Sequence, residues 1–260
     1  MDLRDIAITS FQLDHIPLSF ALPACSARNA RLAIWQAGLG GCKECHAQEL
    51  RELAAAGFFA VSFDNWQHGA RASETAEALC SRVLGDFRRH LWPIIGQSAL
   101  DALRVIDWAI TAHGCHPKVC IGGVSLGGHI SVAVAGLDPR VVSVAAVIAS
   151  PDWNRPGMLH GDPPTLFAQG QPDAYARHFY TWLNPLTNLA RFAHCPAIAF
   201  ELGAEDTRVP PDGAQRFQAA LRGTYECCPE RMRVTLHPGV GHAMTPAMWQ
   251  RALAWFADTP

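Results

Sequence analysis

A strand, a serine turn and a helix follow one another without a loop at residues 119–136, and this succession constrains the fold more than any other feature. The apolar run 119–124 enters a Gly-Val-Ser-Leu-Gly pentapeptide centred on Ser125, and a second apolar run follows. This order is typical of a nucleophile elbow, which exposes a serine hydroxyl at the carboxyl edge of a sheet. Gly123 and Gly127 fit it, because side chains there would collide with neighbouring backbone. The stretch predicts a nucleophilic serine; a glycine-rich turn around a buried serine is the alternative.

The same alternation of short apolar runs and amphipathic stretches continues along the chain. Strands are expected at residues 6–13, 17–22, 31–35, 58–63, 119–124, 141–149, 197–202 and 233–236. Helices are expected at residues 46–56, 75–90, 98–113, 126–136, 212–221 and 245–256. The first two strands predict an antiparallel hairpin at one edge, and the later strand–helix alternation predicts parallel pairing. We therefore expect an α/β fold with a mostly parallel eight-stranded sheet and helices on both faces.

Residues 151–195 interrupt this rhythm. The segment is rich in Pro, Gly and aromatic residues and is too long for a plain connection, which is typical of a functional insertion. We expect a single domain over residues 1–260, with this insertion as a small lid above Ser125. Its apolar side chains would line a substrate pocket, anchor the lid to the core, or do both. The candidates for the pocket are Trp153, Met158, Phe179 and Trp182.

A serine nucleophile needs a base and an acid. After a nucleophile elbow they follow in the order serine, acid, histidine, each in a loop beyond a late strand. Asp206 follows the expected strand 197–202, and His242 follows the expected strand 233–236. We assign Asp206 as the acid that orients the imidazole and His242 as the general base.

Four other residues compete for these roles. Glu205 is adjacent to the assigned acid, but it is expected to be a surface carboxylate. Asp212 is close as well, and its position suits a helix N-cap. His237 lies at the end of a strand rather than in the loop beyond, and His129 is expected to pack along the helix that follows the serine.

Acyl transfer also needs N–H groups that bind an oxyanion. One is expected from Leu126, the residue after the nucleophile, at the positive end of a helix. The second is expected from the loop after the third strand, at residues 36–44, whose glycines can turn an amide inward. We assign this second donor to Leu39.

Cys42, Cys45 and His46 spell C-x-x-C-H, the spacing that attaches a c-type haem and that can also begin a metal site. A structural zinc site needs a second pair of ligands at matching spacing, and the adjacent Cys227 and Cys228 do not supply it. We therefore expect no metal and no cofactor. The motif is interpreted as the end of the glycine loop, with His46 in the first turn of the next helix or capping it.

The bulk properties argue against several classes of partner. The net charge is −2 without a basic stripe, which argues against nucleic acid. The apolar runs are shorter than the ~20 residues of a membrane-spanning helix, and the amino terminus does not resemble a signal peptide. The nine cysteines are an odd number and are expected to be reduced thiols in a cytoplasmic protein. A monomer and a homodimer both remain open.

Five segments together resemble the α/β-hydrolases, in particular small bacterial esterases related to dienelactone hydrolases and the catalytic domains of prolyl-oligopeptidase-type peptidases. They are the glycine loop with its trailing Lys43 and Glu44, DNWQHGAR at 64–71, GGVSLGG around Ser125, GAEDTRVPP around Asp206 and GVGHAMTP around His242. The resemblance covers nearly the whole chain. It departs from the pattern at Ala37, where such esterases usually carry a histidine that braces the loop.

The resemblance implies a serine hydrolase. We expect a carboxylesterase that acts on small to medium acyl esters through an acyl-enzyme and without a cofactor. An amidase, peptidase or lactonase with the same triad is the first alternative. A binding protein that keeps the fold without turnover is the second, and Ala37 is the feature that favours it. By the same resemblance, Asp64 is expected to turn the chain and His68 to belong to the loop or the pocket wall.

Overall fold

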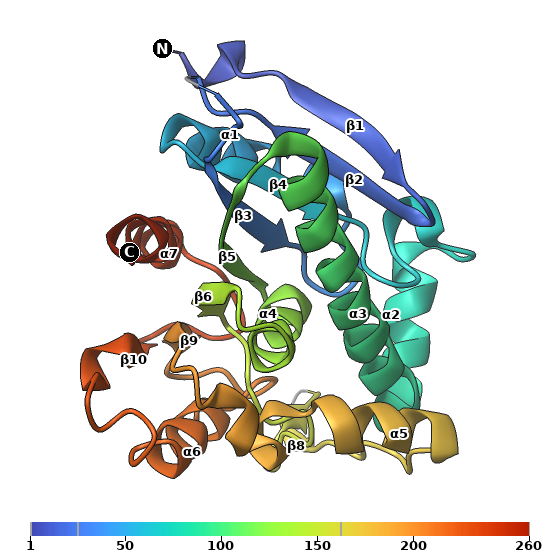
Figure 1. The fold of residues 1–260 in the computed structure, drawn as a ribbon. Coiled ribbons are helices and arrows are strands. Elements are labelled where there is room, and N and C mark those ends of the chain that lie inside the picture. The colour runs from blue at the N-terminus through green and yellow to red at the C-terminus, as the bar shows by residue number, and fades with distance from the viewer. Residues whose placement is uncertain (1, 25, 162, 260) are drawn as a thin grey trace.

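The computed structural model describes residues 2–24, 26–161 and 163–259, and an eight-stranded sheet forms its centre (Figure 1). The strands lie in the order β1-β2-β4-β3-β5-β6-β9-β10. Their bounds are β1 (Ile8–Leu13), β2 (Ile16–Ala21), β3 (Arg31–Gln36), β4 (Phe59–Phe63), β5 (His116–Val124), β6 (Val141–Val147), β9 (Ala197–Gly203) and β10 (Met232–His237). β2 is antiparallel to both β1 and β4, and the remaining neighbours are parallel. The expected α/β fold and its antiparallel edge hairpin are confirmed.

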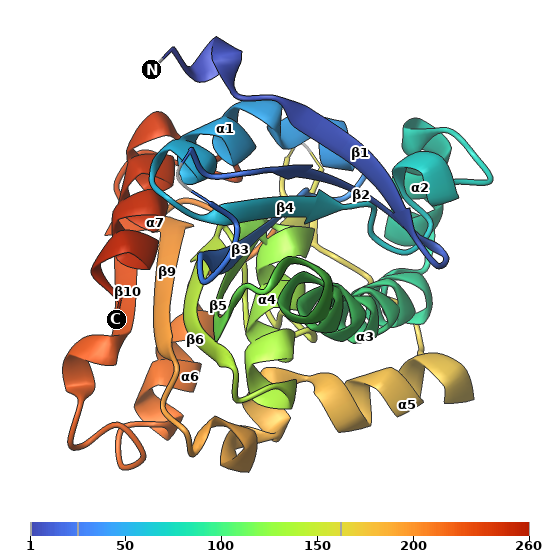
Figure 2. The same ribbon diagram turned by 45° about the horizontal axis from the view of Figure 1, so that its top comes forward.

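Helices connect the strands and cover the sheet (Figure 2). The α-helices are α1 (Ala47–Ala55), α2 (Ala76–Gly85), α3 (Phe87–His113), α4 (Leu126–Leu137), α5 (Ala174–Leu183), α6 (Asp212–Ala220) and α7 (Pro246–Asp258). Short 3-10 turns are η1 (Leu3–Asp5), η2 (Lys43–His46), η3 (Gly69–Arg71), η4 (Pro185–Thr187), η5 (Leu189–Phe192) and η6 (Pro229–Arg231). Within the described ranges, none of the helices combines the length and apolarity that crossing a membrane requires.

The sheet is buried on both faces, because successive side chains of a strand point to opposite sides. In β3, Leu32 and Ile34 join a core that also contains side chains of α3, α4 and α6. Ala33 and Trp35 of the same strand join a second core, built with α1 and α7. All four side chains are fully buried, so β3 is apolar on both faces, as a central parallel strand requires.

The helical region before β5 corrects the expectation of separate helices at 75–90 and 98–113, because α3 runs through Pro93 without a break. Proline removes one helical hydrogen bond and normally ends or kinks a helix. Here tertiary packing keeps the helical turn around Pro93 intact. The indole N–H of Trp92 donates to the carbonyl oxygen of Trp153 at 3.1 Å, and the residues that follow Pro93 are buried in the core. Packing therefore outweighs the local preference for a break.

The insertion at 151–195 leaves the sheet after β6 and returns at β9. It contains the hairpin of β7 (Leu159–His160) and β8 (Thr165–Leu166), and the helix α5, which the sequence analysis does not predict. α5 packs against α3 (Figure 2). Gly96 of α3 leaves room for the ring of Phe179. Tyr180 stacks on Trp92, with ring centroids 4.3 Å apart. The apolar face of α5 therefore anchors the insertion to the core.

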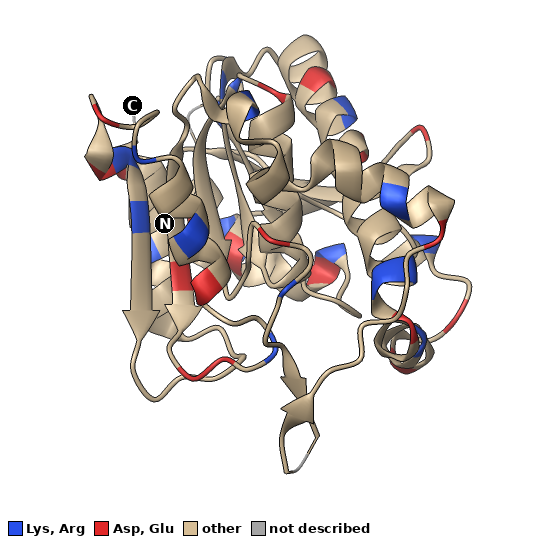
Figure 3. Ribbon diagram, turned by 90° about the horizontal axis from the view of Figure 1, so that it is seen from below, with Lys and Arg blue, Asp and Glu red and all other residues tan. Residues whose placement is uncertain are grey.

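Charged residues and cysteines are spread over the molecule. In the view from below in Figure 3, Lys and Arg are interspersed with Asp and Glu over several elements. Eight of the nine cysteines carry free thiols, and Cys25 lies outside the described residues.

Candidate active site

Ser125 occupies the turn between β5 and α4, with φ of 51° and ψ of −109°. A positive φ is unusual for a residue with a side chain and marks a strained turn. A Cβ at Gly123 or Gly127 would collide with the carbonyl oxygen of Gln36 at the end of β3. The two glycines thus allow β3 to approach the turn closely. The strained turn presents the Ser125 hydroxyl at the carboxyl edge of the sheet, which is the geometry of a nucleophile elbow.

The structure brings Ser125, His242 and Asp206 together from three loops. Ser125 Oγ lies 3.0 Å from His242 Nε2, and His242 Nδ1 lies 2.7 Å from Asp206 Oδ2. Asp206 follows β9 and His242 follows β10, so parallel neighbours deliver both side chains to the same edge. A proton on Nδ1, held by the carboxylate, leaves Nε2 free to accept the serine proton.

Asp206 is fixed in place by its own loop. Its side chain is buried, and its second oxygen, Oδ1, accepts the backbone N–H groups of Arg208 and Val209, each at 2.9 Å. These two hydrogen bonds fix the orientation of the carboxylate and leave Oδ2 to face His242. The carboxylate can therefore orient the imidazole of His242 and stabilise its charged form.

The competing residues make other contacts. Glu205 accepts the backbone N–H of Gly239 at 3.1 Å, and Asp212 pairs with Arg216 at 3.0 Å. His237 Nε2 lies 2.8 Å from the fully buried carboxylate of Glu201. These side chains brace loops and sheet beside the site.

His129 is fully buried in α4 and contacts Arg155. Its Nδ1 accepts the backbone N–H of Ser150 at 3.3 Å. Burial, together with the nearby positive charge of Arg155, lowers the pKa of His129 well below its usual range. The imidazole is therefore a neutral part of the core behind the elbow.

The glycine loop after β3 lies against the elbow. A Cβ at Gly38 would lie 3.7 Å from the Cβ of Ser125. Gly40 has a φ of 80°, and the N–H of Gly41 donates to the carbonyl oxygen of Gly38 at 3.0 Å, closing a turn around Leu39. Leu39 and Leu126 line the same cavity as Ser125. Leu126 opens α4, where backbone N–H groups lack helical acceptors.

Two residues at the end of β4 hold this loop. The fully buried carboxylate of Asp64 accepts the backbone N–H of Lys43 at 2.9 Å and its ammonium at 3.0 Å. The side-chain amide of Asn65 donates to the carbonyl oxygen of Ala37 at 3.1 Å. Asn65 therefore braces the loop at Ala37, the residue that stands where the resemblance leads one to expect a bracing histidine. No sequence motif points to the role of Asn65; its place directly after a buried strand is the signal that could have revealed it.

His68 is buried in the segment that follows. Its Nδ1 lies 2.9 Å from the carbonyl oxygen of Trp66, and burial lowers its pKa. It lines a separate cavity of about 260 Å³ that also contains Gly40 and Cys42. The structure thus places His68 behind the glycine loop rather than beside Ser125.

The cavity at Ser125 has a volume of about 400 Å³. It is lined by Gly38, Leu39, Cys80, Leu84, Phe87, Leu91, Val124, Ser125, Leu126, Ile148, Arg155, Met158, His160, Arg208, His242, Ala243 and Met244. Apolar side chains from α2 and α3 form one wall, and the insertion contributes Arg155, Met158 and His160. The volume and the lining suit a small organic molecule with an apolar portion.

Of the four aromatic and apolar residues expected in the pocket, the structure places only Met158 on the wall of this cavity, within the described residues. Trp153 is fully buried, and Phe179 packs on Gly96. Trp182 is 55% exposed on the outer face of α5. The first two anchor the insertion because large apolar side chains gain most by complete burial.

Arg155 is the residue of this cavity that the sequence analysis does not identify. It is 7% exposed, and its guanidinium lies 4.9 Å from the centroid of the Phe87 ring. Burial lowers its pKa to about 9, against the opposing effects of Asp206 and Asp152. Arg208 adds a second guanidinium at the rim, and the described lining residues include no carboxylate. The cavity therefore favours negative charge.

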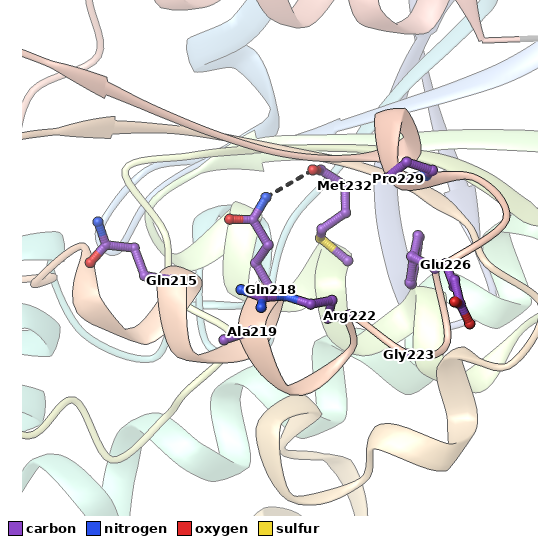
Figure 4. Close-up of a pocket in the computed structure, with 9 residues that line it drawn as sticks. Gln215, Gln218, Ala219, Arg222, Gly223, Glu226, Pro229 and Met232 are labelled. Atoms are coloured by element: carbon purple, nitrogen blue, oxygen red, sulfur yellow. Dashed lines mark hydrogen bonds between the residues drawn. The ribbon is translucent and has the colours of Figure 1, made fainter.

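A larger cavity of about 780 Å³ lies elsewhere, beside α6 and the start of β10 (Figure 4). Its polar groups include Gln218, which donates to the carbonyl oxygen of Met232 at 2.9 Å, and Arg222. The lining that the structure describes holds no serine or histidine, so size alone does not mark the reactive site.

The C-x-x-C-H stretch ends the glycine loop. η2 contains Cys45 and His46, and α1 follows directly. His46 is buried, lies edge-on to Trp35 and reaches Glu49 at 3.3 Å. Among the described residues, no three His, Cys, Asp or Glu side chains gather in a way that could hold a metal ion.

Comparison with known proteins relates the chain to one family. The model of the prolyl oligopeptidase family matches residues 86–259. The Thermus thermophilus protein TT1662 superposes with a TM-score of 0.76 at 23% identity, covering 96% of each chain. A Mycobacterium tuberculosis puromycin-hydrolyzing peptidase gives 0.71 at 16% identity, over 100% of this chain and 40% of its own. Thermogutta terrifontis esterase 2, phosphonylated by sarin, gives 0.59 at 15%, over 98% and 93%.

These likenesses show an α/β-hydrolase fold, as the sequence motifs predict. No curated protein matches the chain significantly. The family match starts at residue 86, so it covers the elbow and the loops of Asp206 and His242 but not the glycine loop.

Proposed function

The chain belongs to the prolyl oligopeptidase family and is a hydrolase, and from this premise we propose that it is a serine carboxylesterase for small to medium acyl esters. The observation that carries the proposal is the continuous contact from Ser125 through His242 to Asp206, at 3.0 and 2.7 Å. A hydroxyl, an imidazole and a buried carboxylate in this order are the parts of a nucleophilic triad.

In the proposed acylation step, Ser125 Oγ attacks the ester carbonyl carbon while its proton passes to His242 Nε2. The carbonyl oxygen becomes an oxyanion, and the N–H groups of Leu39 and Leu126 bind it. Their place on the wall beside Ser125 supports this role. Asp206 stabilises the imidazolium that forms. Each preorganised donor contributes about 3 kcal/mol to transition-state stabilisation in comparable sites.

In the second half, the imidazolium of His242 protonates the alcohol as the bond between carbonyl carbon and alkoxy oxygen breaks. The acyl group remains on Ser125. His242 then takes a proton from water, whose oxygen attacks the acyl carbon, and the acid leaves as Ser125 regains its proton. This cycle needs no cofactor.

The cavity supports an ester with an apolar acyl group. Leu84, Phe87, Leu91 and Ile148 give it an apolar wall, and about 400 Å³ holds a small or medium acyl chain. We propose that the chain is a single domain over residues 1–260 and that residues 151–195 form its cap, since Met158 of this segment lines the cavity. The free cysteines support a cytoplasmic location.

A peptidase, amidase or lactonase with the same triad is the second candidate, and the family match favours a peptidase among these. The guanidiniums of Arg155 and Arg208 in the cavity would repel a substrate with a free amino terminus, which argues against an aminopeptidase. Turnover of aminoacyl amides in preference to esters of equal acyl length would reverse this ranking.

The test uses p-nitrophenyl esters of increasing acyl length with wild type, Ser125→Ala and the control Ser73→Ala, whose serine is exposed outside the site. Ser125→Ala should lower kcat on the order of 10⁴-fold or more with unchanged unfolding, and Ser73→Ala should leave kcat unchanged. A fluorophosphonate should label Ser125 alone. Full activity of Ser125→Ala would disprove the mechanism, and a folded wild type that neither turns over nor labels would indicate a binding protein.

A further inference from the structure

Cys42 and Cys45, which the proposed reaction does not use, face each other at the end of the glycine loop. Their Sγ atoms lie 3.3 Å apart, and the backbone N–H of Cys42 donates to Cys45 Sγ at 3.3 Å. A disulfide has an S–S distance of about 2.05 Å, so bond formation needs an approach of ~1.3 Å. The two free thiols are thus close enough to be joined after a small local movement.

The place of the pair in the fold suits thiol–disulfide chemistry. It lies in the connection from β3 to α1, and β3 pairs in parallel with β4 beyond that helix. C-x-x-C beside a β-α-β unit is the arrangement found in thiol–disulfide redox motifs. His46, the histidine of the stretch, contacts Glu49 and Trp35 instead of completing a ligand set with the sulfurs.

The two thiols have different surroundings. Cys45 is exposed, whereas Cys42 is half-buried. Burial, reinforced by the hydrogen bond with Cys45, raises the pKa of the Cys42 thiol to about 11. Cys42 therefore keeps its proton, and its backbone N–H and its sulfur both contact the Cys45 sulfur. Cys45 is the thiol that an oxidant reaches first, and Cys42 is the resolving thiol.

We propose that Cys42 and Cys45 form a reversible redox pair, oxidised by a peroxide and reduced by a dithiol, whose closure displaces the glycine loop that carries Leu39. The Cys45 thiol gives up its proton and its sulfur attacks a peroxide oxygen. The O–O bond breaks, Cys45 becomes a sulfenic acid, and the leaving hydroxide takes up the proton and departs as the first water. The sulfur of Cys42 then attacks that of Cys45. The S–S bond forms, the S–O bond breaks, and the second water leaves with the Cys42 proton.

The loop is held at both of its ends, by Asp64 at Lys43 and by Asn65 at Ala37, so the residues between these two anchors must absorb the closure. Lys43 is tied to the buried Asp64, so the chain after Cys42 cannot follow the moving sulfur. The movement passes instead to residues 38–41, where the backbone of Gly40 already packs against Cys80. Leu39 lies in this turn. The effect on turnover rests on the proposed function; formation of the disulfide does not.

Peptide mapping tests the pair directly, because trypsin cleaves after Lys43, between the two cysteines. The full-length protein is reduced, freed of reductant, treated with hydrogen peroxide, alkylated, denatured and digested. Peptides 32–43 and 44–51 should be recovered joined, two hydrogens lighter than their sum, and separate after dithiothreitol. Cys45→Ser and Cys42→Ser should abolish the joined species, and the control Cys80→Ser should keep it. Separate peptides in the wild type, with Cys45 overoxidised, would overturn the proposal.

The second part of the test measures kcat for a p-nitrophenyl ester on the same samples. Oxidised wild type should lose ~10-fold in kcat, because a misplaced oxyanion donor is costly, and dithiothreitol should restore it. Cys42→Ser should resist peroxide; an equal loss in that variant would trace the effect to Met158 or Met244 in the cavity and overturn the coupling. A joined peptide with unchanged kcat would also overturn the coupling. A reduced protein without ester turnover contradicts the proposed function instead, and the peptide map still decides the redox pair.

Discussion

The carboxylate of Asp64 binds Lys43 twice, accepting its backbone N–H on one oxygen and its ammonium on the other. Asp64 also accepts the N–H of Ala70 at 2.9 Å, and both its own side chain and that of Lys43 are buried. One buried group thus joins the end of the glycine loop to the segment after β4. The position of Leu39 beside Ser125 depends on this junction.

Asp64→Asn should therefore destabilise the fold and slow turnover. Loss of the charge leaves the buried Lys43 ammonium with only the exposed Glu44, and breaking such a pair costs about 3 kcal/mol or more. Urea unfolding measures the change, with Glu44→Gln as control. Because Glu44 is solvent-exposed, that control should cost less than about 1 kcal/mol. Equal effects of the two substitutions would show that Asp64 has no special role.

Met158→Ala should alter acyl-chain preference, because Met158 lines the cavity at Ser125. Removing its side chain enlarges the apolar space, so kcat/KM should fall by roughly 10-fold for short acyl chains while longer chains lose less. A series of p-nitrophenyl esters measures this. Trp182→Ala is the matched control, because Trp182 is exposed on α5, and its profile should equal that of the wild type. A changed profile in the control would mean that α5 contacts the substrate.

Gly96→Ala should destabilise the contact between α3 and α5. The added methyl group would collide with the ring of Phe179, and overpacking of this kind costs about 1–3 kcal/mol. Gly85→Ala provides the control, since a Cβ there meets nothing within 4 Å, and it should be neutral or stabilise by up to about 1 kcal/mol. Thermal unfolding compares the two. A neutral Gly96→Ala would contradict the close packing of α5.

Stability should fall as the pH drops below about 6.5, in part because His129 is held neutral. The folded state keeps its pKa well below the usual value, so in this range the unfolded chain binds a proton that the folded chain does not. That difference lowers the free energy of unfolding by up to about 1.4 kcal/mol per pH unit. His129→Gln removes the group, so urea unfolding between pH 7 and 5 should show a shallower slope. An unchanged slope would assign the acid sensitivity to other groups, such as the buried His68.

The sequence predicts the sheet because its strands are short apolar runs between amphipathic helices, and this pattern survives in β3, β5, β6 and β9. It also predicts the positions of Ser125, Asp206 and His242, since each follows a strand whose carboxyl end must reach one edge. Asn65 escapes prediction because its contact with Ala37 joins loops that are distant along the chain.

The region from α3 to α5 is where local patterns fail. Pro93 and Gly96 both normally weaken a helix, yet both lie inside α3. Pro93 lies in a buried turn of the helix, and Gly96 leaves room for the ring of Phe179. The amphipathic pattern of α5 is short, and its neighbours are rich in proline and glycine. Assigning Trp153 and Phe179 to the pocket follows from their size, but size also favours complete burial, and burial decides their positions.

The segment between β6 and β9 touches the reactive centre through a few side chains and is otherwise fastened to α3 and α4. Ser125, His242 and Asp206 are each carried by loops outside it. Evolution or laboratory recombination can therefore replace this segment with that of a related protein. Such a replacement would change which substrates enter the cavity, while Ser125, His242 and Asp206 stay in place.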